Sequence, residues 1–145
     1  MHIDSPAFEH HHSIPSKYTC EGENVSPPLV FGDIPPGSKS LALVVDDPDA
    51  PTGTFDHWII WNLPVDTLVL AEGAKVIKMG KNHFGKIGYR GPCPPPGKPH
   101  RYFFKLYALD TLINLPEGSS KGQLEDAMEG HILGRAELVG TYKRH

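Results

Sequence analysis

Hydrophobic and polar positions alternate along parts of this chain with the period of two that is typical of β-strands. In residues 100–109 every second side chain, from His100 to Ala108, falls on one face. Residues 55–63 alternate in the same way and are rich in aromatic and β-branched side chains. Residues 40–46 instead form a nearly continuous apolar run that is too short for a typical helix. We therefore predict two alternating strands and, at 40–46, a central strand that is buried on both faces.

The remaining segments have weaker patterns. Residues 26–36 place a short apolar triplet between proline pairs, which favours a strand at the edge of a sheet because proline cannot donate a hydrogen bond to a neighbour. Residues 75–79 and 135–142 predict two further strands. Residues 80–99 are so rich in glycine and proline that regular structure cannot persist there. We expect this stretch to be a loop with a defined course.

One segment, residues 120–128, has the pattern of a helix. Ser120 and Gln123 have the spacing of a capping box, an apolar stripe follows, and Gly130 can end the helix. Several antiparallel strands with one short C-terminal helix predict a mainly β protein, a sandwich of two sheets. We expect a single domain that spans residues 1–145.

The charge of the chain excludes some classes of partner. The formal net charge is -3 over 145 residues, so the basic surface that nucleic-acid binding needs is absent. No apolar run approaches the length of a membrane span, and the first residues lack the apolar core of a signal peptide. We expect no nucleic-acid partner, no stable membrane insertion and a cytoplasmic location.

Only two cysteines occur, Cys20 and Cys93, and they lie far apart in the sequence. Neither belongs to a paired motif, so no zinc ribbon or redox dithiol is encoded locally. We expect two reduced thiols, and a structural role for Cys93 rather than a reactive one.

Polar residues that can carry chemistry gather where the predicted strands begin or end. An acidic, proline-containing run occupies residues 46–51, a His57-Trp58 pair lies in the next strand, and a proline-rich run occupies residues 91–102. A β-sandwich collects its loops at its two ends, so groups from separate segments can meet at one concave spot. We expect these three runs to converge.

The same three runs resemble the signature blocks of the phosphatidylethanolamine-binding protein family. They are Asp-Pro-Asp-Ala-Pro, His-Trp ahead of Asn62, and Gly-Pro-Cys-Pro-Pro leading to His-Arg-Tyr, in matching order and spacing. The resemblance extends over essentially the whole chain and is closest to the bacterial and archaeal branch, which is often described as Raf-kinase-inhibitor-like. It implies a two-sheet antiparallel Greek-key sandwich and a homodimer.

The resemblance also implies a pocket for phosphate, acetate or a phosphorylated head group. By matched position it assigns ligand-binding roles to Asp47, His57, His100 and Tyr102. We add Gly91 and Pro92, from the same proline-rich run as His100 and Tyr102, as candidate ligand-binding residues. Modulation of a kinase and binding of phospholipid are functions that the resemblance implies and that the residues themselves do not show.

Elementary chemistry supports an anion pocket independently. Two imidazoles and a phenol can donate hydrogen bonds to an oxyanion, and these bonds strengthen where water is excluded. A carboxylate such as Asp47 can accept a ring N–H and so fix the tautomer of a histidine. Gly91 permits a close approach of the backbone, and the prolines of residues 94–96 stiffen the rim. We expect the pocket to be preformed.

Three neighbouring residues are assigned a structural role. Period-two geometry places Arg101 on the face opposite His100 and Tyr102, where it can pair with Asp49. Pro51 closes the acidic run beside them. We expect Asp49, Pro51 and Arg101 to support the pocket without contacting the ligand.

Metal sites are not supported. The acidic run lacks the ligand spacing of a calcium loop. Neighbouring side chains in the run His10 to His12 point apart in an extended segment, so we expect a solvated loop. A second group of residues could be mistaken for a binding platform, but alternating aromatics usually pack in a core. We expect this for Trp58, Trp61, Phe103 and Tyr107.

The function predicted from the sequence is a binding and regulatory module without cofactor, not an enzyme. Its ligand is a small anion or a phosphorylated group, which can belong to a kinase or protease partner. A hydrolase with a histidine base is weakened by the lack of a Gly-x-Ser-x-Gly or His-Glu-x-x-His motif. A protease inhibitor acting through the rigid loop at residues 91–99 stays an alternative.

Overall fold

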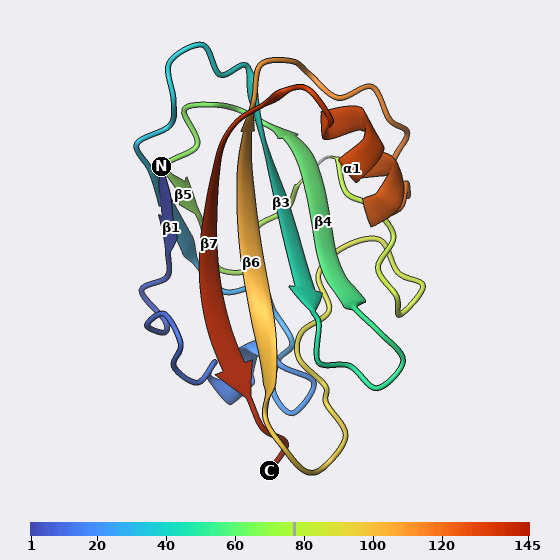
Figure 1. Cartoon of the computed structure of the whole chain (residues 1–145). Helices are drawn as coiled ribbons and strands as arrows, with labels where there is room; N and C mark the ends of the chain where they lie inside the picture. Colours follow the sequence, from blue (N-terminus) through green and yellow to red (C-terminus); the bar gives the residue numbers. More distant parts are fainter. Residues whose placement is uncertain (77) are drawn as a thin grey trace.

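Two antiparallel sheets form the body of the protein, whose computed structural model describes residues 1–76 and 78–145 (Figure 1). The larger sheet has the order β4-β3-β6-β7, and the smaller sheet has the order β1-β2-β5. The strands are β1 (His2–Asp4), β2 (Leu29–Gly32), β3 (Ser40–Asp47), β4 (Phe55–Leu63), β5 (Val69–Leu70), β6 (His100–Leu109) and β7 (Ile132–Tyr142). A 3-10 turn, η1 (Ser16–Tyr18), and one helix, α1 (Lys121–Met128), complete the elements. The prediction of a mainly β fold with two antiparallel sheets and a short C-terminal helix is confirmed.

Strand β3 is buried along its whole length, as its apolar run predicts. It lies between β4 and β6, and both of its faces are covered. Leu43 and Val45 face the core between the sheets, whereas Ala42 and Val44 face a second apolar cluster under α1. The strand therefore has no polar face until it reaches its carboxyl end.

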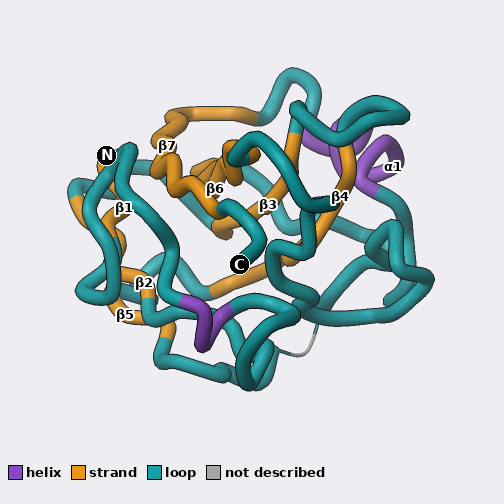
Figure 2. Tube along the Cα trace, turned by 90° about the horizontal axis from the view of Figure 1, so that it is seen from below, coloured by secondary structure: helices purple, strands orange, loops and turns teal. Residues whose placement is uncertain are grey.

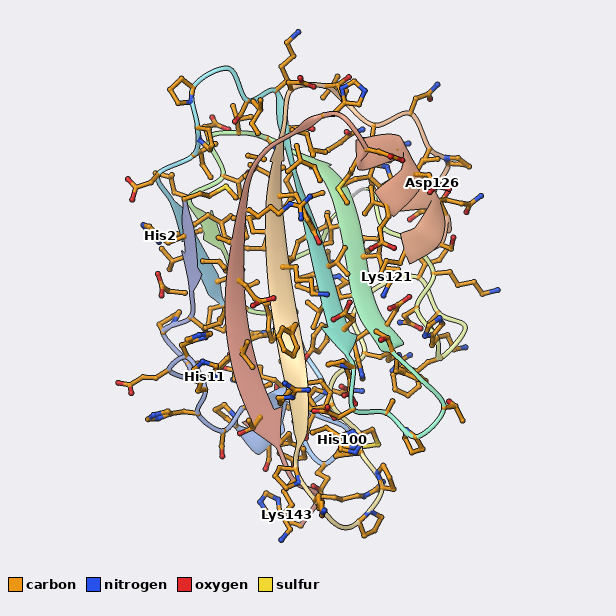
Figure 3. The ribbon with its side chains drawn as sticks, viewed as in Figure 1. His2, His11, His100, Lys121, Asp126 and Lys143 are labelled. Atoms are coloured by element: carbon orange, nitrogen blue, oxygen red, sulfur yellow. A yellow bond between two sulfur atoms is a disulfide. The ribbon has the colours of Figure 1, made fainter. Side chains whose placement is uncertain are left out.

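Helix α1 covers the upper part of the larger sheet, over β3 and β4. Its capping box is formed as predicted: the Ser120 hydroxyl accepts the Gln123 N–H, and the Gln123 side chain accepts the Ser120 N–H. Leu124 and Met128 are buried against the sheet. Lys121 in the first turn reaches the carboxylates of β3 and β4, close to where these strands meet the lower loops (Figure 3).

The smaller sheet departs from the sequence prediction. β2 lies between β1 and β5, so the edge position expected for residues 26–36 is wrong. The prolines flank the strand without entering it, which leaves every β2 residue able to pair. β1 and β5 have too few residues for a periodic pattern to reveal them. Ile77 lies outside the described residues, and the other residues of the expected strand at 75–79 form only an isolated bridge at Met79.

The aromatic residues divide between the two faces of the larger sheet. Trp58 and Trp61 are buried, as predicted. The prediction that Phe103 and Tyr107 are core residues holds only in part, because both are only partly buried. Tyr107 packs against the second apolar cluster under α1, whereas Phe103 belongs to neither cluster. The cationic groups of Arg101 and Lys105 lie over the Phe103 ring, and the guanidinium of Arg135 lies over the Tyr107 ring.

The two cysteines are not reduced thiols. Cys20 and Cys93 form a disulfide with an S–S distance of 2.08 Å across a sequence separation of 73 residues. Spacing in the sequence could not reveal the pair, because only the folded loops bring the two Cα atoms to 5.3 Å. The cytoplasmic location, which was inferred from the lack of a membrane span and of a signal-peptide core in the sequence, stays a prediction.

The loops that follow β3 and precede β6 gather at the lower end of the sandwich. η1 and the C-terminus lie at the same end (Figures 1 and 2). Within residues 1–76 and 78–145, no helix has the length and apolarity needed to cross a membrane.

Candidate functional site

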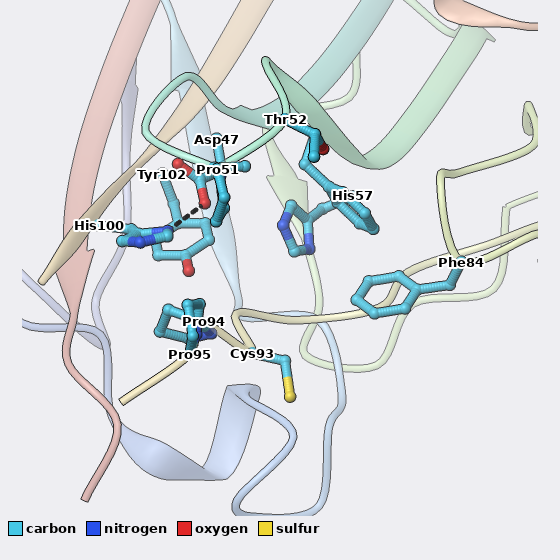
Figure 4. Close-up of a pocket in the computed structure, with 12 residues that line it drawn as sticks. Asp47, Pro51, Thr52, His57, Phe84, Cys93, Pro94, Pro95, His100 and Tyr102 are labelled. Atoms are coloured by element: carbon cyan, nitrogen blue, oxygen red, sulfur yellow. Dashed lines mark hydrogen bonds and ion pairs between the residues drawn. The ribbon is translucent and has the colours of Figure 1, made fainter. Parts of the chain in front are cut away.

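A cavity of about 240 Å³ opens at this lower end of the sandwich. Three strands of the larger sheet contribute to it: β3 supplies Asp47, β4 supplies His57, and β6 supplies His100 and Tyr102 (Figure 4). The three motif runs of the sequence therefore meet, because antiparallel neighbours bring the end of β3 beside the starts of β4 and β6. The expected convergence of Asp47, His57, His100 and Tyr102 is seen in the structure.

Asp47 holds His100 in one orientation. The His100 Nδ1–H donates to Asp47 Oδ2 at 2.7 Å, and both side chains are almost fully buried. The other oxygen of the carboxylate accepts the Asp49 N–H at 2.7 Å. The carboxylate is thus occupied by the protein, and Nε2 is the ring nitrogen of His100 that stays available to a ligand.

The His57 ring is also held by a hydrogen bond at Nδ1, but its partner is a backbone carbonyl. Its Nδ1 lies 2.7 Å from the carbonyl oxygen of Arg90. A carbonyl can only accept, so Nδ1 carries the proton and Nε2 of the neutral ring carries a lone pair. Burial is the largest influence on this group and lowers the pKa of His57, although the Arg90 carbonyl and nearby carboxylates oppose the shift.

Tyr102 places a buried phenolic hydroxyl in the cavity wall. Its ring stands edge-on to His57 at 5.3 Å between centroids. The residue is 1% exposed, and its Oη has no hydrogen-bond partner within the described part of the chain. Burial raises the pKa of Tyr102 well above its ordinary value, so the phenol stays protonated. A buried donor without a partner is costly to the free protein and points to a ligand.

The tautomers of His57 and His100 decide which hydrogen-bond donors and acceptors the cavity presents to a ligand. In their neutral forms both imidazoles present an acceptor, Nε2, and among the buried side chains that line the cavity Tyr102 presents the donor. Each ring becomes a second donor only after it takes up a proton. Protonated histidines would therefore supply further donors to a fully ionised oxyanion in this cavity.

Aromatic and apolar side chains form the rest of the wall. Phe55 lies 5.1 Å from His57 and 4.8 Å from Phe84, measured between ring centroids. Phe84 comes from the long loop before β6 and is 42% exposed at the cavity mouth. The sequence patterns single out neither residue as part of a site. Phe55 could have been found, because it shares a strand face with His57, but nothing in the loop sequence identifies Phe84.

Gly91 and Pro92, which the sequence assigns to the ligand, do not line the cavity. A Cβ at Gly91 would come within 1.9 Å of the Tyr18 carbonyl oxygen, so glycine is required for the approach of two loops and not for a ligand. Gly91 N–H donates to Asn24 Oδ1, and the Pro92 carbonyl accepts the Cys20 N–H. Both residues hold the loop that carries the rim.

The support expected from Asp49 and Arg101 is present. The guanidinium donates to both carboxylate oxygens, at 2.9 and 2.8 Å, and the Arg101 N–H adds a third bond. These hydrogen bonds lower the pKa of Asp49 to about 2. Pro51 differs from the prediction in that it lines the cavity at its exposed rim, with Thr52 beside it (Figure 4).

The histidine run at residues 10–12 takes no part in this site. All three residues are exposed, and none lines the cavity. His10 Nδ1 accepts the Val139 N–H at 2.9 Å, so this segment covers part of the edge of β7.

Comparison with known proteins finds a matching family and relatives that are about half identical to this chain. The family described as phosphatidylethanolamine-binding protein matches residues 4–143. The chain is 50% identical over 151 residues to a UPF0098 protein of Methanothermobacter thermautotrophicus, covering 99% of each chain. It is 51% identical over 150 residues to a UPF0098 protein of Chlamydia muridarum, again covering 99% of each chain.

Two solved structures are similar over their full length. The phosphatidylethanolamine-binding protein homologue CT736 from Chlamydia trachomatis has a TM-score of 0.95 at 47% identity, covering 99% of this chain and 97% of the other. YbcL of E. coli, described as a new member of the mammalian family, has a TM-score of 0.90 at 31% identity, covering 99% and 98%. The fold, the sequence blocks and these matches show that this chain belongs to the phosphatidylethanolamine-binding protein family.

Proposed function

We propose that this protein binds a small anionic or phosphorylated ligand in the cavity formed by Asp47, His57, His100 and Tyr102, and acts as a binding and regulatory module. The observation that carries the proposal is the Tyr102 hydroxyl, which is buried in the cavity that His57 and His100 also line and has no partner among the described residues. The family description supports a head-group ligand.

The ligand is bound together with protons. Because Arg90 and Asp47 occupy the Nδ1 atoms, Tyr102 and the two neutral imidazoles together offer one donor and two acceptors. A phosphate monoester that carries one proton can donate to one Nε2 and accept from Tyr102, and it matches the second ring once that ring is protonated, whereas a dianion is matched when both rings are protonated. In both cases affinity for the anion rises as the pH falls.

The apolar part of the wall suits the organic group to which a phosphate is attached. Phe55 and Phe84 lie beside His57, between the polar floor and the exterior. A head group or a phosphorylated side chain can place its phosphate on the floor and its carbon atoms against these rings. This arrangement favours an esterified phosphate over free phosphate.

A hydrolase is the second candidate, and one observation favours it. The lowered pKa of His57 leaves a neutral Nε2 in the cavity near neutral pH, which is the state that a general base requires. We assign the protein as a binder, and turnover of any compound in a panel of phosphoesters would overturn that assignment. Inhibition of a protease through residues 91–99, a homodimer and a kinase partner stay predictions.

Histidine NMR tests the proposal directly. Inorganic phosphate added at pH 6 should shift the imidazole signals of His57 and His100 together, because both border the same ligand. His131, which pairs with Asp110 outside the cavity, serves as the internal control. His100→Ala should abolish the response of His57, whereas His131→Ala should leave it intact. Unmoved signals at millimolar phosphate would rule the proposal out.

A further inference from the structure

The Cys20–Cys93 disulfide stands in the wall of the cavity. Cys93 lines the cavity, and the next two residues, Pro94 and Pro95, form its rim (Figure 4). Cys20 belongs to the segment that follows η1. The bond therefore joins the rim to a part of the chain that is otherwise remote from the ligand.

The rim has few other attachments. Before Cys93, the loop is anchored to the segment around η1: Tyr89 Oη donates to the Tyr18 carbonyl at 2.7 Å, and Gly91 N–H donates to Asn24 at 2.8 Å. After Cys93, residues 94–99 make no hydrogen bond to another described residue, and the four prolines among them have no N–H to donate. The disulfide is thus the last fixed point before β6 begins at His100.

The surroundings of the disulfide favour its reduction. Both cysteines are only partly buried, so a reductant can reach them. Arg144 Nη1 lies 3.7 Å from Cys93 Sγ and can stabilise a thiolate there. Cys93 is therefore the better leaving group, and Cys20 is the sulfur that an incoming thiolate attacks.

We propose, on the basis of the anion-binding function above, that the redox state of Cys20–Cys93 controls the affinity of the cavity for its ligand. A thiolate of a cellular dithiol attacks Cys20 Sγ, forms a mixed disulfide, and expels Cys93 as a thiolate with the electron pair of the broken bond. The second thiol of the reductant then attacks the mixed disulfide and releases Cys20. Two electrons pass to the protein, one proton goes to Cys20 and the other to solvent while Cys93 stays a thiolate, and the dithiol becomes a disulfide.

Reduction weakens binding for two reasons that act in the same direction. The rim loses its last tether, so the residues from Pro94 to Pro99 must be ordered again whenever a ligand binds. A Cys93 thiolate also adds negative charge to the wall, which opposes an anion. The oxidised protein is the form that binds well.

Calorimetric titration with inorganic phosphate at pH 6 tests the inference. We expect the dissociation constant to rise about tenfold after reduction with dithiothreitol and to recover after reoxidation. The variant Cys20→Ser/Cys93→Ser cannot form the disulfide, so its affinity for phosphate should not respond to dithiothreitol. Its rim residues should be as weakly ordered as those of the reduced protein. The variant Asn24→Ala, which removes a hydrogen bond from the same loop but keeps the disulfide, should retain the response to reductant.

The outcomes separate the two proposals. Equal affinity of the oxidised and reduced proteins would overturn redox control and leave anion binding intact. No phosphate binding by the oxidised protein would overturn the proposed function and, with it, the inference. A ¹⁵N–¹H spectrum of the reduced protein supplies the last check, since global unfolding would show that the disulfide supports the fold and not the cavity alone.

Discussion

The Tyr102 hydroxyl is the group on which the proposed anion binding most depends. Tyr102→Phe removes the one donor that does not need protonation, and a hydrogen bond to a charged group contributes about 1.5–3 kcal/mol. We expect phosphate affinity to fall about 10- to 100-fold. Stability should be unchanged or slightly higher, because an unpartnered polar group leaves the interior. Isothermal titration and urea unfolding measure the two effects.

Tyr142 is the matched control for this substitution. Its hydroxyl is satisfied by Glu21 and Ser16, and the residue does not line the cavity. Tyr142→Phe should lower the free energy of unfolding by about 1 kcal/mol and leave phosphate affinity unchanged. If both variants lost affinity equally, the loss could not be assigned to the Tyr102 hydroxyl.

For individual residues, the sequence predicts the polar side chains of the candidate site better than the loop residues that complete it. Asp47, His57, His100 and Tyr102 lie in or beside long strands, where period-two geometry and adjacent strand ends constrain their positions. Phe84 and the Arg90 carbonyl lie in a loop whose course depends on distant contacts. Local sequence carries no information about those contacts, and so the partner that fixes the His57 tautomer could not be foreseen.

Helix α1 is tied to the larger sheet by an ion-pair cluster as well as by its apolar face. Lys121 Nζ lies 2.8 Å from Asp56 Oδ1 and 3.3 Å from Asp46 Oδ2, and both carboxylates are almost fully buried. Burial alone lowers the pKa of Lys121, but the bonds to Asp56 and Asp46 outweigh it and raise the pKa above its ordinary value. These carboxylates neighbour Asp47 and His57 in sequence, so the cluster also fixes the strand ends that carry the site.

Replacing Lys121 tests this link. Lys121→Met leaves the Asp56 carboxylate without its ammonium partner, so we expect a loss of about 3 kcal/mol in the free energy of unfolding. Lys105→Met is the matched control, because Lys105 is more exposed and Lys121 still neutralises Asp46 in its absence. This control should lose about 1 kcal/mol or less. Equal losses in urea unfolding would contradict a distinct role for Lys121.

Whether an element could be predicted depended on its length. β3, β4 and β6 are long enough for their hydrophobic patterns to show, and the capping box marks the start of α1. β1 and β5 form because neighbouring strands supply their hydrogen-bond partners, which is a tertiary effect without a local signal. The same reason explains why β2 was placed at an edge and not between them.

The disulfide acts on the molecule as a whole by restricting the unfolded chain. A cross-link over 73 residues removes conformational entropy worth about 4 kcal/mol from the unfolded state on a loop-closure estimate. Cys20→Ser/Cys93→Ser should therefore lower the free energy of unfolding by up to that amount. Urea unfolding of the oxidised protein with and without reductant measures the same difference without a mutation. A change well below 1 kcal/mol would show that the unfolded chain is already compact near these residues.

The free energy of unfolding depends on pH through proton binding, and a bound ligand should change that dependence. Burial holds the pKa of His57 in the folded protein below its ordinary value of 6.5. Between these two pKa values the unfolded chain binds a proton that the folded chain does not, so this residue makes the free energy of unfolding fall as the pH falls through that window. An anion at Nε2 favours the protonated ring and raises the pKa of the folded state. Bound anion must then offset part of the loss.

The melting temperature at matched ionic strength should therefore respond more strongly to anion at pH 5.5 than at pH 7.5. Sulfate is a useful probe beside phosphate, because its charge is constant over this range and any pH dependence must come from the protein. His57→Gln removes the titrating ring, so the additional stabilisation at low pH should shrink in this variant. If sulfate stabilised the wild-type protein equally at both pH values, uptake of protons with the anion would be excluded, and Tyr102 together with neutral imidazoles would have to account for binding.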